Sequence, residues 1–167
     1  VRVVKSYAYL DQAPVQDVDL RGSLEDTLVI LHHKLKAGIE VVRQFDAALP
    51  RIEAHAGELN QVWTNLIDNA IDAMAGRGTL TVATRCDEAN LVVDISDTGH
   101  GMPADVQHRA FEPFFTTKDV GKGTGLGLDI SRRIVSERHG GEITFDSGPA
   151  GTTVHVRLPR RRGDEDT

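Results

Sequence analysis

The sequence predicts an α+β domain built as a two-layer sandwich, with a mixed, mostly antiparallel sheet and helices on one face. Two observations carry this prediction. Apolar residues recur at helical spacing in three segments, and they alternate with polar residues in two pairs of segments typical of β-hairpins. Helices and hairpins that follow one another in this order favour an antiparallel-rich sheet.

Length and composition limit the possible classes of protein. The chain has 167 residues, enough for one domain. Nineteen basic and 25 acidic residues give a formal charge of −6, which disfavours nucleic acid as a partner. The single cysteine, Cys86, excludes an internal disulfide and a cysteine-rich zinc site. We expect a cytoplasmic domain, because no apolar run approaches the length of a membrane span and no signal peptide opens the chain.

The first half of the chain is expected to hold a linker, two helices and one strand. Residues 1–21 contain a proline that interrupts any helix, and they are interpreted as the end of a helix followed by a linker. Ser23 is the expected N-cap of a helix that ends at Gly38. A β-branched run predicts a strand over residues 39–45. The longest helix is predicted over residues 57–74, where a wide apolar stripe indicates a buried face.

The second half is expected to hold two hairpins, a long loop and one further helix. The hairpin strands are residues 79–86 with 90–97, and 142–146 with 152–158. Residues 98–124 show little periodicity beyond a short helix at 103–110, and so long a loop in a compact domain is usually functional. A helix is predicted over residues 124–139. Residues 160–167 are charged, with nothing to bury, and predict a disordered tail.

Polar side chains line one face of the long predicted helix. Asn65, Asn69 and Asp72 recur at i, i+4 and i+7, and Asn65, Asp68 and Asp72 form an overlapping stripe. Each buried amide or carboxylate needs a partner, or costs about 1–3 kcal/mol. One explanation is a satisfied network between helix and sheet. The other is a site for a hard cation such as Mg²⁺, which prefers oxygen ligands.

Two glycine-rich segments are candidates for ligand contact. The first, Asp97-Thr-Gly-His-Gly101, ends a strand, and glycine there permits positive φ and a close approach of a ligand to the backbone. The same pattern alone is also common in plain turns. The second, Gly121-Lys-Gly-Thr-Gly-Leu-Gly127, leads directly into a helix, whose N-terminal end attracts anions. Its spacing is that of neither a P-loop nor a dinucleotide-binding or protein-kinase glycine loop.

Taken in order, these motifs resemble the Bergerat-type ATP-binding fold shared by histidine kinases, DNA gyrase, Hsp90 and MutL. The segment Phe111-Glu-Pro-Phe-Phe-Thr-Thr-Lys118 is similar to the F box of histidine kinases, which lies between the two glycine motifs. The resemblance covers residues 22–159. It implies the catalytic domain of a two-component sensor histidine kinase with a mobile ATP lid, and makes residues 1–21 the end of a dimerisation helix and its linker.

The resemblance also implies roles for particular residues. Asn69 matches the asparagine that holds Mg²⁺, and Asn65 a second polar position facing the phosphates. Asp97 matches the carboxylate that recognises the adenine amino group, and Gly99 and Gly101 match the glycines that admit the base. The other implied ATP-binding residues are Asp72, Met102, Arg109, Lys118, Lys122, Gly123, Thr124, Gly125, Leu126, Gly127 and Thr152. Asn65, Asn69 and Lys118 are the catalytic candidates.

In this interpretation the cofactors are ATP and Mg²⁺, and the γ-phosphate goes to a histidine on a dimerisation domain outside this chain. None of the seven histidines is followed by Asp or Glu, as the phosphorylated histidine of the family usually is. The implied partners are that domain and a response regulator. The full-length protein would be a homodimer, and this chain alone a monomer.

Two alternatives remain open at this stage. One is an ATP hydrolase of the gyrase or Hsp90 kind, which would carry a glutamate as general base where Asn65 stands. An amide cannot accept the proton, although Asp68-Asn-Ala-Ile-Asp72 is closer to gyrase and many histidine kinases have a basic residue in place of Asp72. The other alternative is a non-catalytic nucleotide-binding module.

Overall fold

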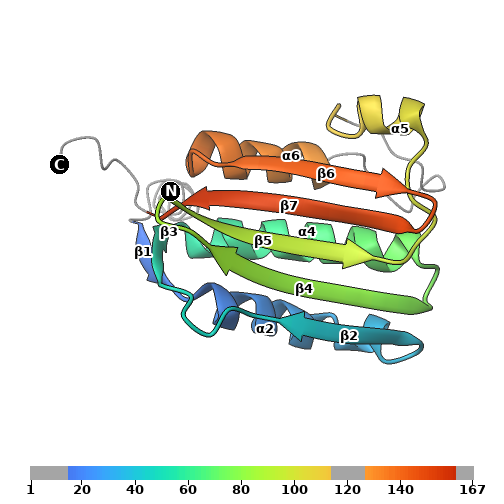
Figure 1. The fold of residues 1–167 in the computed structure, drawn as a ribbon, viewed down its shortest axis with the longest axis horizontal. Helices are drawn as coiled ribbons and strands as arrows, with labels where there is room; N and C mark the ends of the chain where they lie inside the picture. The colour runs from blue at the N-terminus through green and yellow to red at the C-terminus, as the bar shows by residue number, and fades with distance from the viewer. Residues whose placement is uncertain (1–14, 114–126, 161–167) are drawn as a thin grey trace, which may run out of the picture.

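The computed structural model describes residues 15–113 and 127–160 (Figure 1). In these residues one five-stranded sheet has the strand order β2-β4-β5-β7-β6, with β2 parallel to β4 and every other pair antiparallel. The strands are β2 (Ile39–Gln44), β4 (Gly78–Cys86), β5 (Asn90–Asp97), β6 (Glu142–Gly148) and β7 (Gly151–Pro159). The predicted α+β fold with a mixed sheet is confirmed.

The helices α2, α4 and α6 form a second layer behind one face of the sheet, as Figure 1 shows, and α5 lies apart from it, beyond β6. The long helix α4 lies between α2 and α6 and contacts both. The helical elements are α2 (Leu20–Ile30), α3 (His32–Leu35), α4 (Ala56–Ala73), α5 (Ala104–Arg109), α6 (Gly127–Arg133) and the π-helical turn η1 (Ile134–Arg138). None of these described helices combines the length and the apolar character needed to cross a bilayer.

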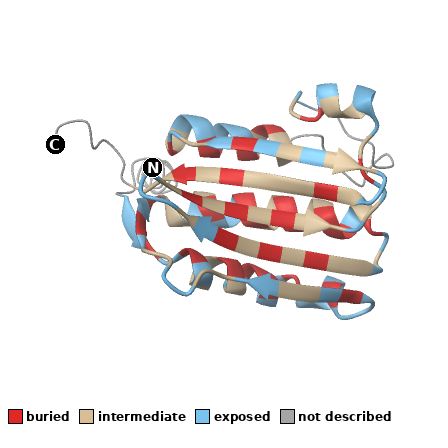
Figure 2. Cartoon of the chain, in the orientation of Figure 1, coloured by how far each residue is buried: buried red, intermediate tan, exposed pale blue. Residues whose placement is uncertain are grey.

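The core lies between the sheet and this helical layer. Buried and partly exposed residues alternate along β4 and β5, as Figure 2 shows, because successive side chains of a strand point to opposite faces. From the helical side, α4 contributes the apolar stripe that the sequence predicts. Its fully or almost fully buried residues are Leu59, Val62, Trp63, Leu66, Ile67, Ala70 and Ile71. This packing fixes α4 against the sheet and so sets the direction of its polar side chains.

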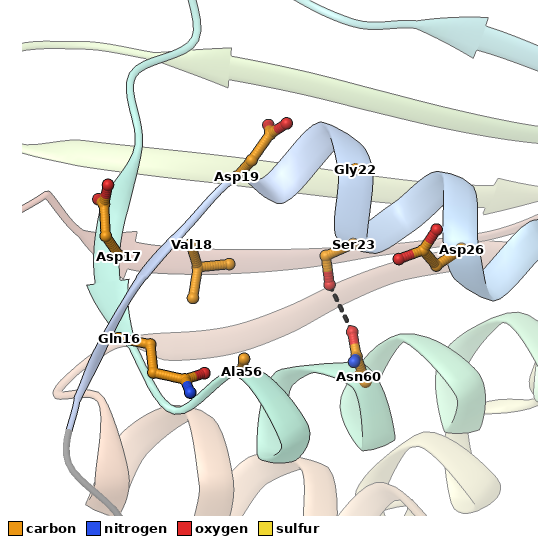
Figure 3. A pocket seen from close by; sticks show the side chains of 9 residues that line it. All are labelled: Gln16, Asp17, Val18, Asp19, Gly22, Ser23, Asp26, Ala56 and Asn60. Atoms are coloured by element: carbon orange, nitrogen blue, oxygen red, sulfur yellow. Dashed lines mark hydrogen bonds between the residues drawn. The ribbon is translucent and has the colours of Figure 1, made fainter.

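The N-terminal part of the fold differs from the expectation. The first helix begins at Leu20, and its N-cap is Asp19, whose carboxylate accepts a hydrogen bond from the backbone N–H of Arg21. The expected N-cap at Ser23 is therefore wrong. The Ser23 hydroxyl instead accepts from the indole N–H of the buried Trp63 at 3.1 Å and donates to Asn60 at 2.5 Å (Figure 3). The helix also breaks at Leu31, short of the expected end at Gly38.

Two short strands were not expected from the sequence. Strand β1 (Gln16–Val18) pairs antiparallel with β3 (Ile52–Ala54) and makes a separate two-stranded sheet. Residues 16–18 thus already belong to a folded element, although the sequence interpretation places them in a linker ending at residue 21. Strand β3 leads directly into α4, so this small sheet joins the N-terminal segment to the start of the long helix.

The start of α4 is held by the end of the last helical segment. The buried His139 accepts a hydrogen bond from the backbone N–H of His55 at 3.0 Å, and its other ring nitrogen donates to the carbonyl of Ile134 at 2.9 Å. The neighbouring Arg138 forms an ion pair with Glu58 in the first turn of α4. These contacts join α4 to η1 at the end remote from Asp97.

The outer face of the sheet carries polar side chains. Ser96 on β5 and Thr153 on β7 form a hydroxyl pair at 2.8 Å. Further along the strands, His155 lies between the carboxylates of Asp94 and Asp146. Burial lowers the pKa of His155, but these two carboxylates outweigh that effect and raise its pKa above the ordinary value.

Glycines bring backbone segments into direct contact at one end of the sheet. A Cβ atom on Gly101, where φ is +74°, would overlap the carbonyl oxygen of Gly148 in the β6–β7 turn. A Cβ atom on Gly99 would overlap the carbonyl of Ala73 at the end of α4, and one on Gly151 the carbonyl of Asp97. Three segments therefore meet backbone to backbone where β5 ends.

We predict that Gly101→Ala lowers the free energy of unfolding by at least about 1–2 kcal/mol, the cost of a left-handed conformation for an L-residue, before any steric overlap is added. Gly148→Ala is the matched control, because a Cβ atom there meets no atom within 4 Å. Urea denaturation of both variants measures the difference. Equal stabilities of the two variants would contradict this account of the contact.

Candidate functional site

The predicted site residues that the structure describes gather at one end of the molecule, where β5 ends, β6 turns into β7 and α6 begins. At the right-hand end of Figure 1 these segments lie beside the C-terminal end of α4, with α5 above them. The site is thus lined by the sheet on one side and by the helical layer on the other. Asp97, Thr152 and Met102 belong to the sheet side, and Asn65 and Asn69 to the helical side.

Asp97 is the last residue of β5 and is half-buried. Its carboxylate accepts hydrogen bonds from the backbone N–H of Gly99, at 2.8 Å, and from that of Thr152. Burial raises the pKa of Asp97 above the ordinary value, although these two hydrogen bonds and the nearby His100 oppose the shift. Backbone donors thus fix the orientation of a carboxylate that can accept further hydrogen bonds from an amino group.

A chain of hydroxyl and backbone groups lies beside Asp97. The hydroxyl of the buried Thr152 is 2.7 Å from that of Ser147, and the Ser147 oxygen accepts a hydrogen bond from the Met102 N–H, also at 2.7 Å. On the other side of Met102, the Gln107 side chain donates to its carbonyl at 2.7 Å. Sequence reasoning missed Ser147 and Gln107. Ser147 could have been found, because it pairs with Thr152 across the short 148–151 turn.

The amides of α4 face the first turns of α6. Asn65 donates long hydrogen bonds, of 3.4 Å each, to the carbonyl of Gly127 and the hydroxyl of the buried Ser131. The Asn69 amide lies on the same side, because a Cβ atom on Gly127 would be 3.8 Å from its nitrogen. Both side chains are half-buried. They therefore form one polar edge against the segment that begins α6.

Asp68 of α4 has its ion-pair partner away from this edge. Asp68 forms an ion pair with Lys34 of α3 at 2.7 Å, and its hydrogen bond to Lys34 raises the pKa of that ammonium group. Asp72 is exposed, and its charge acts on Lys34 in the same direction. Asn65 and Asp68 of the overlapping stripe therefore have partners on different elements, α6 and α3, and the predicted ATP contact of Asp72 stays a prediction.

Several predicted residues are not tested by this geometry. Arg109 lies in α5, where it is exposed and pairs with Glu112 at 3.2 Å. A set of lid and loop candidates lies outside the described residues: Lys118, Lys122, Gly123, Thr124, Gly125 and Leu126. Their proposed contacts with the triphosphate stay predictions.

The donor set on α4 fits a hydrated magnesium ion. The amide oxygens of Asn65 and Asn69 are hard ligands, and Mg²⁺ takes most of its remaining ligands from water and phosphate oxygens. Across residues 15–113 and 127–160, no three His, Cys, Asp or Glu side chains gather as an all-protein metal site. A cation at this edge would consequently depend on a phosphate ligand for most of its affinity.

Comparison with known sequences agrees with this geometry. Residues 54–162 match the family described as histidine kinase-, DNA gyrase B- and HSP90-like ATPases. The sensor kinase CckA of Brucella abortus is 40% identical over 159 residues, which cover 86% of this chain and 17% of that protein. The chain thus spans less than a fifth of the length of this relative.

Solved structures match over most of the chain. The catalytic domain of the histidine kinase ThkA superposes with a TM-score of 0.81 at 29% identity, covering 89% of this chain and 99% of the ThkA domain. ThkA in complex with the response regulator TrrA matches with a TM-score of 0.76 at 26% identity, covering 87% of this chain and 42% of that one.

Full-length ShkA in complex with AMPPNP matches with a TM-score of 0.77 at 27% identity, covering 87% of this chain and 31% of ShkA. The fold and the sequence therefore indicate the same family. The chain belongs to the histidine kinase-, DNA gyrase B- and HSP90-like ATPase family, and within it is a catalytic ATP-binding domain of the sensor histidine kinase type.

Proposed function

We propose that this domain binds Mg-ATP between α4 and the end of the sheet, and presents the γ-phosphate to a histidine on a separate dimerisation domain. The main support for the proposal is that two sets of polar side chains occur together. We call them the purine-reading edge and the phosphate-facing edge. Asp97 and Thr152 form the first edge, and Asn65 and Asn69 form the second, against the start of α6. The two edges belong to one end of the molecule, as an extended nucleotide requires.

Asp97 recognises the base by accepting a hydrogen bond from the adenine amino group. Its backbone contacts with Gly99 and Thr152 hold the carboxylate in place before the ligand arrives. Thr152 completes the hydrogen bonds to the base through water, and Met102 lies against the ring. Fixing these groups in advance reduces the entropy lost on binding.

Asn69 holds the magnesium ion, and Asn65 faces the phosphates. Bound Mg²⁺ neutralises the phosphate charge, and transfer then depends mainly on alignment, which can lower a barrier by about 7–11 kcal/mol. Lys118, Arg109 and the 121–127 loop supply cationic and N–H donors in this proposal. Asn65 argues against the hydrolase alternative, because its amide cannot take a proton from an attacking water molecule.

The proposed partners follow from the same chemistry. The domain needs a histidine-bearing dimerisation domain, to which residues 1–21 would connect it, and a response regulator that receives the phosphoryl group. ThkA, a structural match, was solved with the response regulator TrrA, which supports a partner of this class. We further propose a homodimeric full-length protein and a cytoplasmic position for this domain.

Phosphotransfer tests the proposal directly. The chain is incubated with γ-labelled Mg-ATP, alone and with the kinase's own dimerisation domain. We expect acid-labile phosphohistidine only in the mixture, and little ADP from the chain alone. Rapid ADP release by the chain alone would favour the hydrolase, and nucleotide binding without either reaction would favour a non-catalytic module.

We predict that Asp97→Asn weakens ATP binding about tenfold to hundredfold, because an amide that presents a donor to the amino group costs about 1–3 kcal/mol. Wild-type affinity should also fall on acidification as the pH approaches the raised pKa of Asp97, since protonation turns one of its two acceptor oxygens into a donor and removes the charge that strengthens this hydrogen bond. Calorimetry across a pH series measures both effects. Asp146→Asn, the same change at an exposed carboxylate of the outer face, is the control; unchanged affinity in Asp97→Asn refutes the adenine assignment.

We predict that Asn69→Ala removes the Mg²⁺ dependence of ATP binding, because the helix then loses the amide oxygen that the proposal assigns to the ion. Titrations with and without Mg²⁺ should give the same dissociation constant in this variant. Gln61→Ala, at an exposed position of the same helix, should keep the wild-type difference. A persistent difference in Asn69→Ala would show that the metal is held elsewhere.

A further inference from the structure

At the end of the sheet, the two predicted adenine contacts lie on the neighbouring strands β5 and β7. The next strand, β6, places a third polar side chain beside them. In the strand register, Asp97 on β5 is the partner of Thr152 on β7, and Thr152 is the partner of Ser147 on β6. Partners in a sheet point to the same face, so all three side chains lie on the face that the helices cover. Thr152 therefore lies between the carboxylate and a second hydroxyl group.

We propose that Ser147 is a positioning residue for adenine recognition, and that it sets both the Thr152 hydroxyl and the Met102 backbone. This inference rests on the proposed binding of adenine at Asp97. Ser147 is joined to Thr152 and to Met102 by contacts of 2.7 Å each, which are full hydrogen-bond distances. It would act through these two neighbours and make no contact with the base itself.

The direction of the hydrogen bonds explains how Ser147 acts. Its oxygen accepts the Met102 N–H, and in the Ser147–Thr152 pair, where either hydroxyl group could donate, the proposal assigns the Ser147 proton to the Thr152 oxygen. In that arrangement the donors run from Met102 through Ser147 to Thr152, and the Thr152 hydroxyl keeps its proton for the ligand side. Hydrogen bonds in such a chain strengthen one another. Removing Ser147 would leave the Thr152 hydroxyl free to rotate and the Met102 N–H without its acceptor.

The Met102 backbone is held from both sides. Gln107 of α5 donates to its carbonyl at 2.7 Å, while Ser147 accepts from its N–H. One residue earlier, Gly101 packs against the carbonyl of Gly148, the residue after Ser147. The loop after Asp97 and the end of β6 thus form one unit, and Ser147 is its side-chain link.

The same sheet provides a matched control. Ser96 on β5 and Thr153 on β7 form an equivalent hydroxyl pair at 2.8 Å, one residue further along β7 and on the opposite, outer face. Ser96→Ala therefore removes one serine hydroxyl from a cross-strand Ser–Thr pair without touching the site. The conservative variant Ser147→Thr keeps the hydroxyl group and suits a strand, because threonine is β-branched.

The experiment measures binding of ADP without Mg²⁺ by calorimetry, so that recognition of the base dominates. We expect Ser147→Ala to raise the dissociation constant about five- to tenfold, the range for one lost hydrogen-bonded group. Ser147→Thr should stay within about twofold of wild type on the same scale, and Ser96→Ala should match wild type. Inosine diphosphate, which lacks the amino group, should be affected little by Ser147→Ala, so that selectivity for adenine over hypoxanthine falls.

A double-mutant cycle with Thr152→Val tests whether Ser147 acts through Thr152. The combined loss should be smaller than the product of the two single losses, because the second change removes a group that the first has already disturbed. Independent effects, equal losses for both nucleotides, or an unchanged Ser147→Ala would each overturn the inference. Absence of ADP binding by the wild-type chain, or no effect of Asp97→Asn, would instead refute the proposed function on which it rests.

Discussion

The site depends on the close contact of three backbone segments where β5 ends. The loop after Asp97 lies against the end of α4 at Gly99 and against the β6–β7 turn at Gly101, and the turn returns to Asp97 through Gly151. Backbone can approach backbone this closely only where no Cβ atom intervenes. These backbone contacts explain why the Asp-x-Gly-x-Gly motif needs glycine at both positions, whether or not a ligand binds. Their role in admitting the base stays a prediction.

The second feature on which the site depends is the helix α4, whose two sides have different roles. One side of α4 is anchored by its apolar stripe to the sheet, and its start is held by His139 and Arg138. The amides of Asn65 and Asn69 are therefore presented toward α6 by a rigid element. Asp68 is directed to Lys34 on the other side of the helix. A polar stripe that looks uniform in the sequence is divided in space into a candidate ligand edge and a surface ion pair.

Much of this architecture could be predicted from the sequence, because long periodic elements carry strong local signals. The long helix, both hairpins and the strand after Gly38 are present within a few residues of their expected bounds. Strands β1 and β3 have three residues each, too few to show an alternating pattern. Ser23 is a good N-cap by local rules, but the indole N–H of the buried Trp63 needs an acceptor, and Asp19 caps the helix instead. Ser147 was missed for a similar reason, since its importance depends on partners from two other segments.

The two hairpin turns of the sheet differ in how freely their length can vary. The turn between β4 and β5 is exposed and is closed by its own Asp87, which accepts from the N–H groups of Ala89 and Asn90. Extra residues there would extend into solvent. The 148–151 turn, in contrast, has backbone neighbours on both flanks, so an insertion would separate Asp97 and Thr152 from the loop that supports them. Relatives and engineered variants should therefore accumulate insertions at the first turn and conserve the length of the second.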